Sequence, residues 1–245
     1  MRNVFFAFVI LLFASCTSRP LQLSDLKFVD NRWLVHNPKE ALIANRIDTM
    51  FLIIDSDTLE YYVYDENGRI LENTELLPWY TKYKFQYDSV GLLKADWYYH
   101  AGYIEENKIS YRFEPDSLLL YQYRYYEQDS DSELYFFAQF KFDKQGKVLE
   151  QNGYQKGRLV SKTIYEYNSL EQPIYIRAIH GSDSTAFEEK WNISYFYTNG
   201  KLDSVISTWY YDDYKPKKMY YDERGLCYRL IAGNRITNCV YKQRK

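Results

Sequence analysis

A short pattern that recurs along most of the chain limits what this sequence can fold into. The pattern is an aromatic residue, any residue, a second aromatic residue, Asp, two further residues, Gly, any residue and an aliphatic residue. It occurs about seven times, and three copies are nearly regular. These copies span 62–70, 85–93 and 140–148, and drifted copies begin at Tyr111, Tyr165, Tyr195 and Tyr221. The chain is therefore built largely from one repeated unit.

The spacing of the repeat predicts paired β-strands. From Gly68 to Gly225 there are 157 residues (225 − 68) over six intervals, or about 26 per repeat, enough for two strands of about nine residues and two turns of about four. Residues 26–54 add two strands around a short helix, with Asn37 as its cap and Pro38 at its first position. A round barrel of so many strands would leave a lumen too wide for side chains to fill. The predicted fold is therefore all-β: a long antiparallel meander of about 14–16 strands in about seven hairpin repeats, curled or folded on itself.

The Asp-x-x-Gly segment is interpreted as a turn and not as a catalytic acid. Asp accepts hydrogen bonds from the following backbone N–H groups, and Gly supplies a positive φ. Between the paired aromatic residues stand mostly polar ones, such as Gln86, Lys141 and Glu166. An antiparallel sheet with one wet face has this alternation, whereas a transmembrane barrel needs apolar residues at those positions. We therefore expect the aromatic pairs to face the core and expect no lipid-facing barrel.

The N-terminal residues indicate export. Arg2 precedes about ten apolar residues, 4–13, a run too short to cross a bilayer. The following Phe13-Ala14-Ser15-Cys16 resembles the lipobox of bacterial lipoproteins, which implies that 1–15 is a signal peptide and that Cys16 is lipidated. Thr17, in place of Asp, implies sorting to the outer membrane. Residues 16–25 would be a tether and 26–245 a single β-repeat domain. The alternative is plain secretion with Cys16 as a thiol, and both routes end in an oxidising compartment.

The repeated units also resemble a known family. The Tyr-x-Tyr-Asp-x-x-Gly-x-Leu units, above all 165–173, are similar to the YD repeats of RHS-type bacterial surface proteins, over about residues 60–228. In that family the repeats build a β-sheet shell around a toxin. This chain is too short to enclose a cargo domain, so the resemblance implies only the strand-turn-strand unit. The chain is likewise similar to small envelope lipoproteins of Bacteroidetes with degenerate YD repeats.

Few residues have the spacing of a chemical site. Cys227 and Cys239 flank an expected hairpin turn, 232–234, so the expectation is a cross-strand disulfide worth about 2–3 kcal/mol or, alternatively, two buried thiols. The histidines His36, His100 and His180 lack metal-ligand spacing. Segment 129–133 begins like a calcium loop but lacks the Gly and Glu such a loop needs. With no phosphate-loop, dinucleotide or nucleophile-elbow motif, we expect no metal, no cofactor and no catalytic residue.

The best candidate for recognition is aromatic. Lys and Arg total 31 against 33 Asp and Glu, a net charge of −2, which gives no basic surface for nucleic acid. Trp-Tyr groups lie near the variable connections and could stack on sugars or bind protein, or could simply close the ends of the core. These groups are Trp79 and Tyr80; Trp97, Tyr98 and Tyr99; and Trp209, Tyr210 and Tyr211.

These features predict a lipid-anchored binding or scaffolding module of the cell envelope, without catalysis. It would bind a glycan or an envelope protein through its variable loop tips, and its other partner would be the membrane that holds its lipid. The alternative is a periplasm-facing lipoprotein that assists outer-membrane assembly or holds a hydrophobic ligand, and the third reading is a glycan hydrolase. We expect the outer membrane as the location, with the domain facing the periplasm in preference to the cell surface.

Overall fold

The computed structural model describes residues 38–76, 80–89, 91–100, 103–114, 117–126, 133–181, 186–210 and 216–244. The signal peptide, Cys16, the tether, the expected cap Asn37 and Trp79 lie outside the described residues. No helix among the described residues is long and apolar enough to span a membrane. The elements are α1 (Lys39–Ala44), β1 (Ile47–Ile54), β2 (Asp57–Tyr64), β3 (Ile70–Glu75), β4 (Thr81–Tyr87), β5 (Leu93–His100), β6 (Tyr103–Glu114), β7 (Ser117–Tyr126), β8 (Glu133–Phe142), β9 (Val148–Gln155), β10 (Arg158–Tyr167), β11 (Pro173–His180), β12 (Phe187–Thr198), β13 (Lys201–Tyr210), β14 (Lys217–Tyr221), β15 (Cys227–Ala232) and β16 (Arg235–Gln243).

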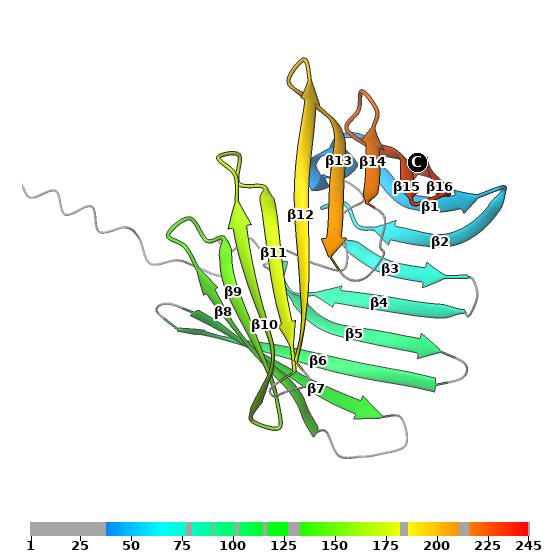
Figure 1. Ribbon diagram of the computed structural model, residues 1–245. Helices are drawn as coiled ribbons and strands as arrows, with labels where there is room; N and C mark the ends of the chain where they lie inside the picture. Colours follow the sequence, from blue (N-terminus) through cyan, green and yellow to red (C-terminus); the bar gives the residue numbers. More distant parts are fainter. Residues whose placement is uncertain are drawn as a thin grey trace, which may run out of the picture.

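The strands form a closed antiparallel barrel, so the predicted curled or folded-over meander is wrong. Each strand pairs with its sequence neighbours, and β16 returns to pair with β1, where Leu52 lies opposite Cys239. Closure pairs both edges that an open meander would leave exposed. In Figure 1 strands β3–β7 run across the view while β10–β13 run steeply to them. The sequence argument weighed the width of a closed lumen but not the unpaired edges that an open meander leaves, and the closed sheet has no such edges.

Apolar side chains line much of the inner wall. A single buried cluster runs along this wall through neighbouring strands and has members on β7, β8, β11 and β14 among others. Leu118 and Ala138 are 0 % exposed, and Ile176 and Met219 are 1 % exposed. The prediction that the repeated aromatic residues face the core is confirmed for Tyr62, Tyr64, Phe140 and Tyr165, which belong to this cluster.

The Asp-x-x-Gly segments form one recurring turn, as predicted. In the turn of 143–147, Asp143 Oδ1 accepts hydrogen bonds from the backbone N–H groups of Gln145 (2.8 Å) and Lys147 (2.9 Å), and Gly146 has a φ of 80°. Glu171 stands at the glycine position of its turn and also has a positive φ, 62°. The other turns of this kind begin at Asp65, Asp88, Asn168 and Asp222. All lie at one end of the barrel, which we call the turn rim; the opposite end, with the variable connections, is the loop rim.

Tyrosines near the ends of the even-numbered strands explain why the pattern keeps an aromatic residue there. Each donates its hydroxyl hydrogen bond to the carbonyl of the first residue of the preceding odd-numbered strand. The bonds are Tyr87 to Ile70 (2.8 Å), Tyr167 to Val148 (2.7 Å), Tyr195 to Pro173 (3.1 Å) and Tyr241 to Cys227. A buried phenol needs such a partner, so the repeat supplies both the ring and its acceptor.

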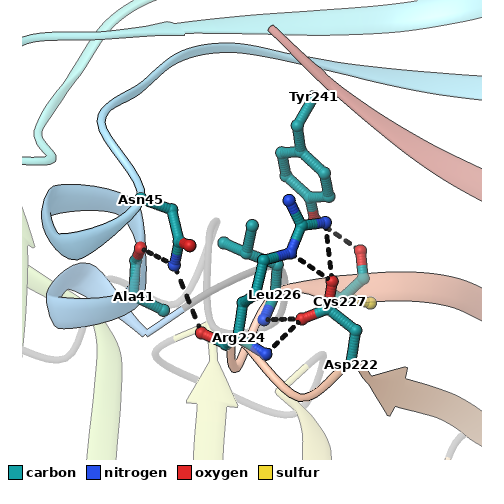
Figure 2. A network of polar contacts seen from close by, with 7 residues as sticks. All are labelled: Ala41, Asn45, Asp222, Arg224, Leu226, Cys227 and Tyr241. Atoms are coloured by element: carbon teal, nitrogen blue, oxygen red, sulfur yellow. Dashed lines mark hydrogen bonds and ion pairs between the residues drawn. The ribbon is translucent and has the colours of Figure 1, made fainter. Parts of the chain in front are cut away.

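Helix α1 covers part of the turn rim. Leu42 belongs to the buried cluster, and Asn45 Nδ2 donates to the carbonyls of Ala41 (2.8 Å) and Arg224 (3.3 Å), which ties the helix to the turn between β14 and β15 (Figure 2). Gly68 has a φ of 70°, and a Cβ there would lie 3.1 Å from the Lys39 carbonyl oxygen. Pro38 occupies the cap position with no side-chain cap, so its expected place at the first helical residue is corrected.

Candidate functional site

The inward face of β2–β6 is polar and aromatic, unlike the apolar interior near α1. The register places Tyr62 beside Asn73, Asn73 beside Tyr83, Tyr83 beside Tyr98, and Tyr98 beside Glu105. On the loop-rim side of this row lies a second row of Glu60, Glu75, Thr81, His100 and Tyr103. On its turn-rim side lie Asp96 and Asn107, which pair with each other. Tyr62 belongs to the interior cluster, so strand alternation turns these residues inward. We call them the polar wall.

Glu60 and Asn73 form the first contact of the polar wall. The Asn73 amide donates to Glu60 Oε1 at 2.6 Å, and the Tyr62 hydroxyl donates to the same oxygen. Asn73 is 0 % exposed, and among the described residues its Oδ1 has no hydrogen-bond donor. Glu75 lies directly opposite Glu60 in the register. Partial burial and the negative charge of Glu60 raise the pKa of Glu75, so negative charge gathers at this part of the wall.

The same arrangement recurs on β5 and β6. The Asn107 amide donates to Asp96 Oδ1 at 2.9 Å and to Glu105 Oε1 at 3.2 Å. All three residues are at most 9 % exposed, and Asn107 Oδ1 has no donor within the described chain. A buried acceptor without a donor costs about 1–3 kcal/mol. The polar wall therefore has two amide oxygens whose hydrogen-bonding capacity the described residues leave unused.

Tyrosine rings separate the two amide–carboxylate groups. The rings of Tyr83 and Tyr98 have centroids 5.1 Å apart, and Tyr98 also stacks on His100 at 6.0 Å. Both tyrosines are half-buried, unlike the asparagines on either side. Ring faces next to carboxylate and amide oxygens suit a ligand that has both C–H faces and hydroxyl groups. The C–H faces would stack on the rings, and the hydroxyl groups would donate hydrogen bonds to the oxygens.

A second group of reactive side chains lies on the inward face of β14–β16. Cys239 donates its S–H hydrogen to Cys227 across 4.0 Å, which lowers the pKa of Cys227. Burial lowers the pKa of Lys217, and Glu60 and the two sulfurs oppose that shift.

The turn between β15 and β16 is shorter than expected. Ala232 pairs with Arg235, so the turn has two residues, Gly233 and Asn234, and not the expected three. The β14–β15 pairing has a register shift between Tyr220 and Tyr221, and this irregularity lies where Cys227 turns its sulfur inward.

The aromatic candidates from the sequence do not gather at one place. Tyr98 belongs to the polar wall, whereas its neighbours Trp97 and Tyr99 face outward, where Tyr99 lies 5.6 Å from the Lys84 ammonium. Tyr80 is 55 % exposed at the loop rim. Trp79 and Tyr211 lie outside the described residues, as do the side chains of Trp209 and Tyr210. Sequence reasoning missed Asn73, Asn107, Asp96 and Glu105. They could have been found as polar residues at strand positions that the alternation assigns to the inward face.

Ion pairs recur on the outward wall. Glu150 on β9 accepts from Lys141 and Lys162, both at 2.9 Å, and from the amide of Asn152 at 2.8 Å. Comparable contacts join Lys82 to Glu72 at 2.7 Å and Lys190 to Glu188 at 2.9 Å. These groups lie within strands, where a transmembrane barrel carries its apolar band. This part of the wall is therefore suited to water.

Glu150 should make stability depend on pH. Burial acts to raise its pKa, but the hydrogen bonds from Lys141, Lys162 and Asn152 prevail and lower it from 4.5 to about 2. A lowered folded-state pKa stabilises the protein above the unfolded-state value, and the benefit is lost as the pH falls from about 4.5 to about 2. We expect Glu150→Gln to lower the free energy of unfolding by about 1 kcal/mol at neutral pH, and this loss to vanish as the pH falls from about 4.5 to about 2.

Urea unfolding at a series of pH values measures the free energy of unfolding of both proteins. Glu166→Gln, at an exposed glutamate of β10, is the control, and parallel curves for wild type and Glu150→Gln would contradict the assignment.

Within the described residues no group of three or more His, Cys, Asp or Glu side chains could hold a metal ion.

No protein-family model matches the sequence, and no curated protein matches it. Solved structures that match this one include a porin-like protein from Bacteroides vulgatus ATCC 8482, at 10% identity and a TM-score of 0.41, with 80% of this chain and 98% of that one covered. A porin-like protein from Bacteroides uniformis ATCC 8492 matches at 11% identity and a TM-score of 0.32, with the same coverage of 80% and 98%.

Proposed function

We propose that this chain is a non-catalytic binding barrel of the outer membrane, tethered by a lipid on Cys16, which takes a hydroxyl-rich ligand such as a glycan segment against its polar wall. The observation that carries the proposal is the pair of buried amide oxygens, of Asn73 and Asn107, that lack donors among the described residues beside half-buried tyrosine rings. Sugar hydroxyls would supply the donors once the side chains that cover these two buried oxygens move aside, and the half-buried rings would take the sugar faces.

The distribution of polarity inside the barrel favours entry from the loop rim. At the other end, α1 and the residues around Leu42 pack the interior. The exposed members of the polar wall, Glu75 and Tyr103, belong to the row nearest the loop rim. A hydrophobic ligand would need an apolar space, but the described apolar part of the interior is occupied by side chains such as Leu118 and Met219. The proposed ligand is therefore polar, and the variable loops surround its entrance.

Tyr98→Ala tests the polar wall against a matched neighbour. Oligosaccharides released from the envelope of the source bacterium are incubated with the protein, and bound species are detected by native mass spectrometry. We expect sugar-sized mass additions to the wild type, weakened about tenfold in Tyr98→Ala because a stacking face is lost. Tyr99→Ala, on the same strand but facing outward, should bind as the wild type does. No sugar adduct, or equal binding by both variants, would refute the proposed site.

Glycan hydrolysis is the second candidate, because one Asn107 amide contacts both Asp96 and Glu105. Two carboxylates close together beside a tyrosine are the minimum that a retaining glycosidase requires, at about 5–5.5 Å. The same incubation distinguishes the two functions. If the wild type shortens the oligosaccharides and the Glu105→Gln variant does not, the function is hydrolysis and not binding. Intact bound sugars support the binding barrel.

A further inference from the structure

The outward face of β14, β15, β16, β1 and β2 carries exposed apolar side chains together with basic ones. Ile236 is 51 % exposed, Val240 47 % and Tyr228 43 %. Val240 pairs with Phe51, and Phe51 pairs with Tyr61, with those two ring centroids 6.2 Å apart. These residues lie at outward positions of neighbouring strands, with Asn238 between Ile236 and Val240 on β16, and we call this surface the docking face. Exposed apolar side chains gathered on one face mark an interaction site.

The charges on the docking face are all positive. Lys218, Arg229 and Lys242 are exposed at outward positions of β14, β15 and β16. In these five strands the acidic residues are Asp48 and Asp57, near strand ends, and Glu60, which faces inward. Elsewhere on the outward wall, Glu150 accompanies lysines. Glu72 of β3 borders the docking face, where it accepts a hydrogen bond from the Tyr61 hydroxyl at 3.0 Å and pairs with Lys82. The docking face therefore combines apolar side chains with cations, and the acid at its edge is already paired.

We infer that the docking face binds the surface of a membrane that carries anionic phospholipids. Phosphate headgroups complement Lys218, Arg229 and Lys242, while Ile236, Val240 and the tyrosine rings reach the boundary between headgroups and acyl chains. A second copy of the chain is a poorer occupant, because a two-fold contact would set the same cations against one another. The inference does not depend on the proposed ligand or on the lipid at Cys16. It states which side of the barrel lies on the membrane.

Vesicle flotation of the mature chain with Cys16→Ser, which cannot carry the lipid, tests the docking face alone. We expect it to float with vesicles of phosphatidylethanolamine and phosphatidylglycerol and to stay behind with phosphatidylcholine. Arg229→Glu and Lys218→Glu should each weaken binding about fivefold or more, since each basic residue near such a surface contributes about that factor. Ile236→Glu with Val240→Glu should abolish flotation. Leu159→Glu, at a 39 % exposed position of β10 outside the docking face, is the control and should float normally.

Three results would overturn the inference. The first is no flotation of the Cys16→Ser chain, or equal flotation with both kinds of vesicle. The second is unchanged flotation of the Ile236→Glu, Val240→Glu variant when its circular dichroism and melting temperature match the wild type. The third is a dimer in light scattering that this variant dissociates, because the docking face would then bind a second copy. Loss of sugar binding leaves the inference intact, since the polar wall lies inside the barrel.

Discussion

Replacing Leu118 by alanine should lower the free energy of unfolding by about 2–5 kcal/mol, the range for a buried leucine that leaves a cavity. Leu118 is 0 % exposed on β7 and lies opposite Phe140 of β8 in the buried cluster. Leu118 stands on a strand of a closed barrel that is paired on both sides, so the surroundings cannot collapse onto the missing side chain without moving the barrel wall. Urea unfolding followed by tryptophan fluorescence and circular dichroism measures the change.

The control for Leu118 is Leu149→Ala on β9, where the side chain is 42 % exposed. This substitution should cost about 0.5 kcal/mol or less. Equal costs for the two variants would show that the interior is not filled at the level of Leu118. That result would also remove the argument that the ligand is polar, because an unfilled apolar interior could hold a hydrophobic molecule.

Oxidation of Cys227 and Cys239 to a disulfide should stabilise the protein by about 3 kcal/mol through loop closure in the unfolded chain. Both residues are buried, and their sulfurs are 4.0 Å apart on neighbouring strands. In the reaction both thiols lose their protons and two electrons pass to an oxidised thiol compound such as oxidised glutathione, which becomes two thiols. The bond would join β15 to β16, the strand that closes the barrel on β1.

Intact mass before and after oxidation, with alkylation of remaining thiols, reports the disulfide, and urea unfolding with and without reductant reports its contribution. We expect reductant to destabilise the oxidised wild type and to leave Cys239→Ser unaffected. Protein exported to the periplasm should arrive oxidised. Two alkylated cysteines in exported protein, or a stability that does not respond to reductant, would contradict this prediction and favour two buried thiols.

Local features of the fold could be predicted because each depends on residues close together in the chain. In the turns that begin at Asp65, Asp143 and Asp222, the side chain of the first residue accepts hydrogen bonds from backbone groups two and four residues later, so the pattern itself contains donor and acceptor. The antiparallel pairing and the inward position of Phe140 follow from the same short-range alternation. Helix α1 was also predicted, although Pro38 is one position earlier in it than expected.

The candidate site could not be predicted in the same way. In the series Trp97, Tyr98 and Tyr99, the sequence does not distinguish the ring that enters the polar wall from the two that face water, because this depends on the register of β5 with β4 and β6. The contacts of Asn73 with Glu60 and of Asn107 with Asp96 cross between strands. Each asparagine is unremarkable by itself, and the site exists only because neighbouring registers bring the pairs to one face.

The sequence by itself determined the hairpin unit, its turn chemistry and the faces of its strands, because hydrogen bonds and alternation within about ten residues specify them. The tertiary structure alone decided that β16 meets β1 across the whole chain and that residues of many strands join one buried cluster. Closure depends on the summed twist of all the strands, and no single repeat carries that information.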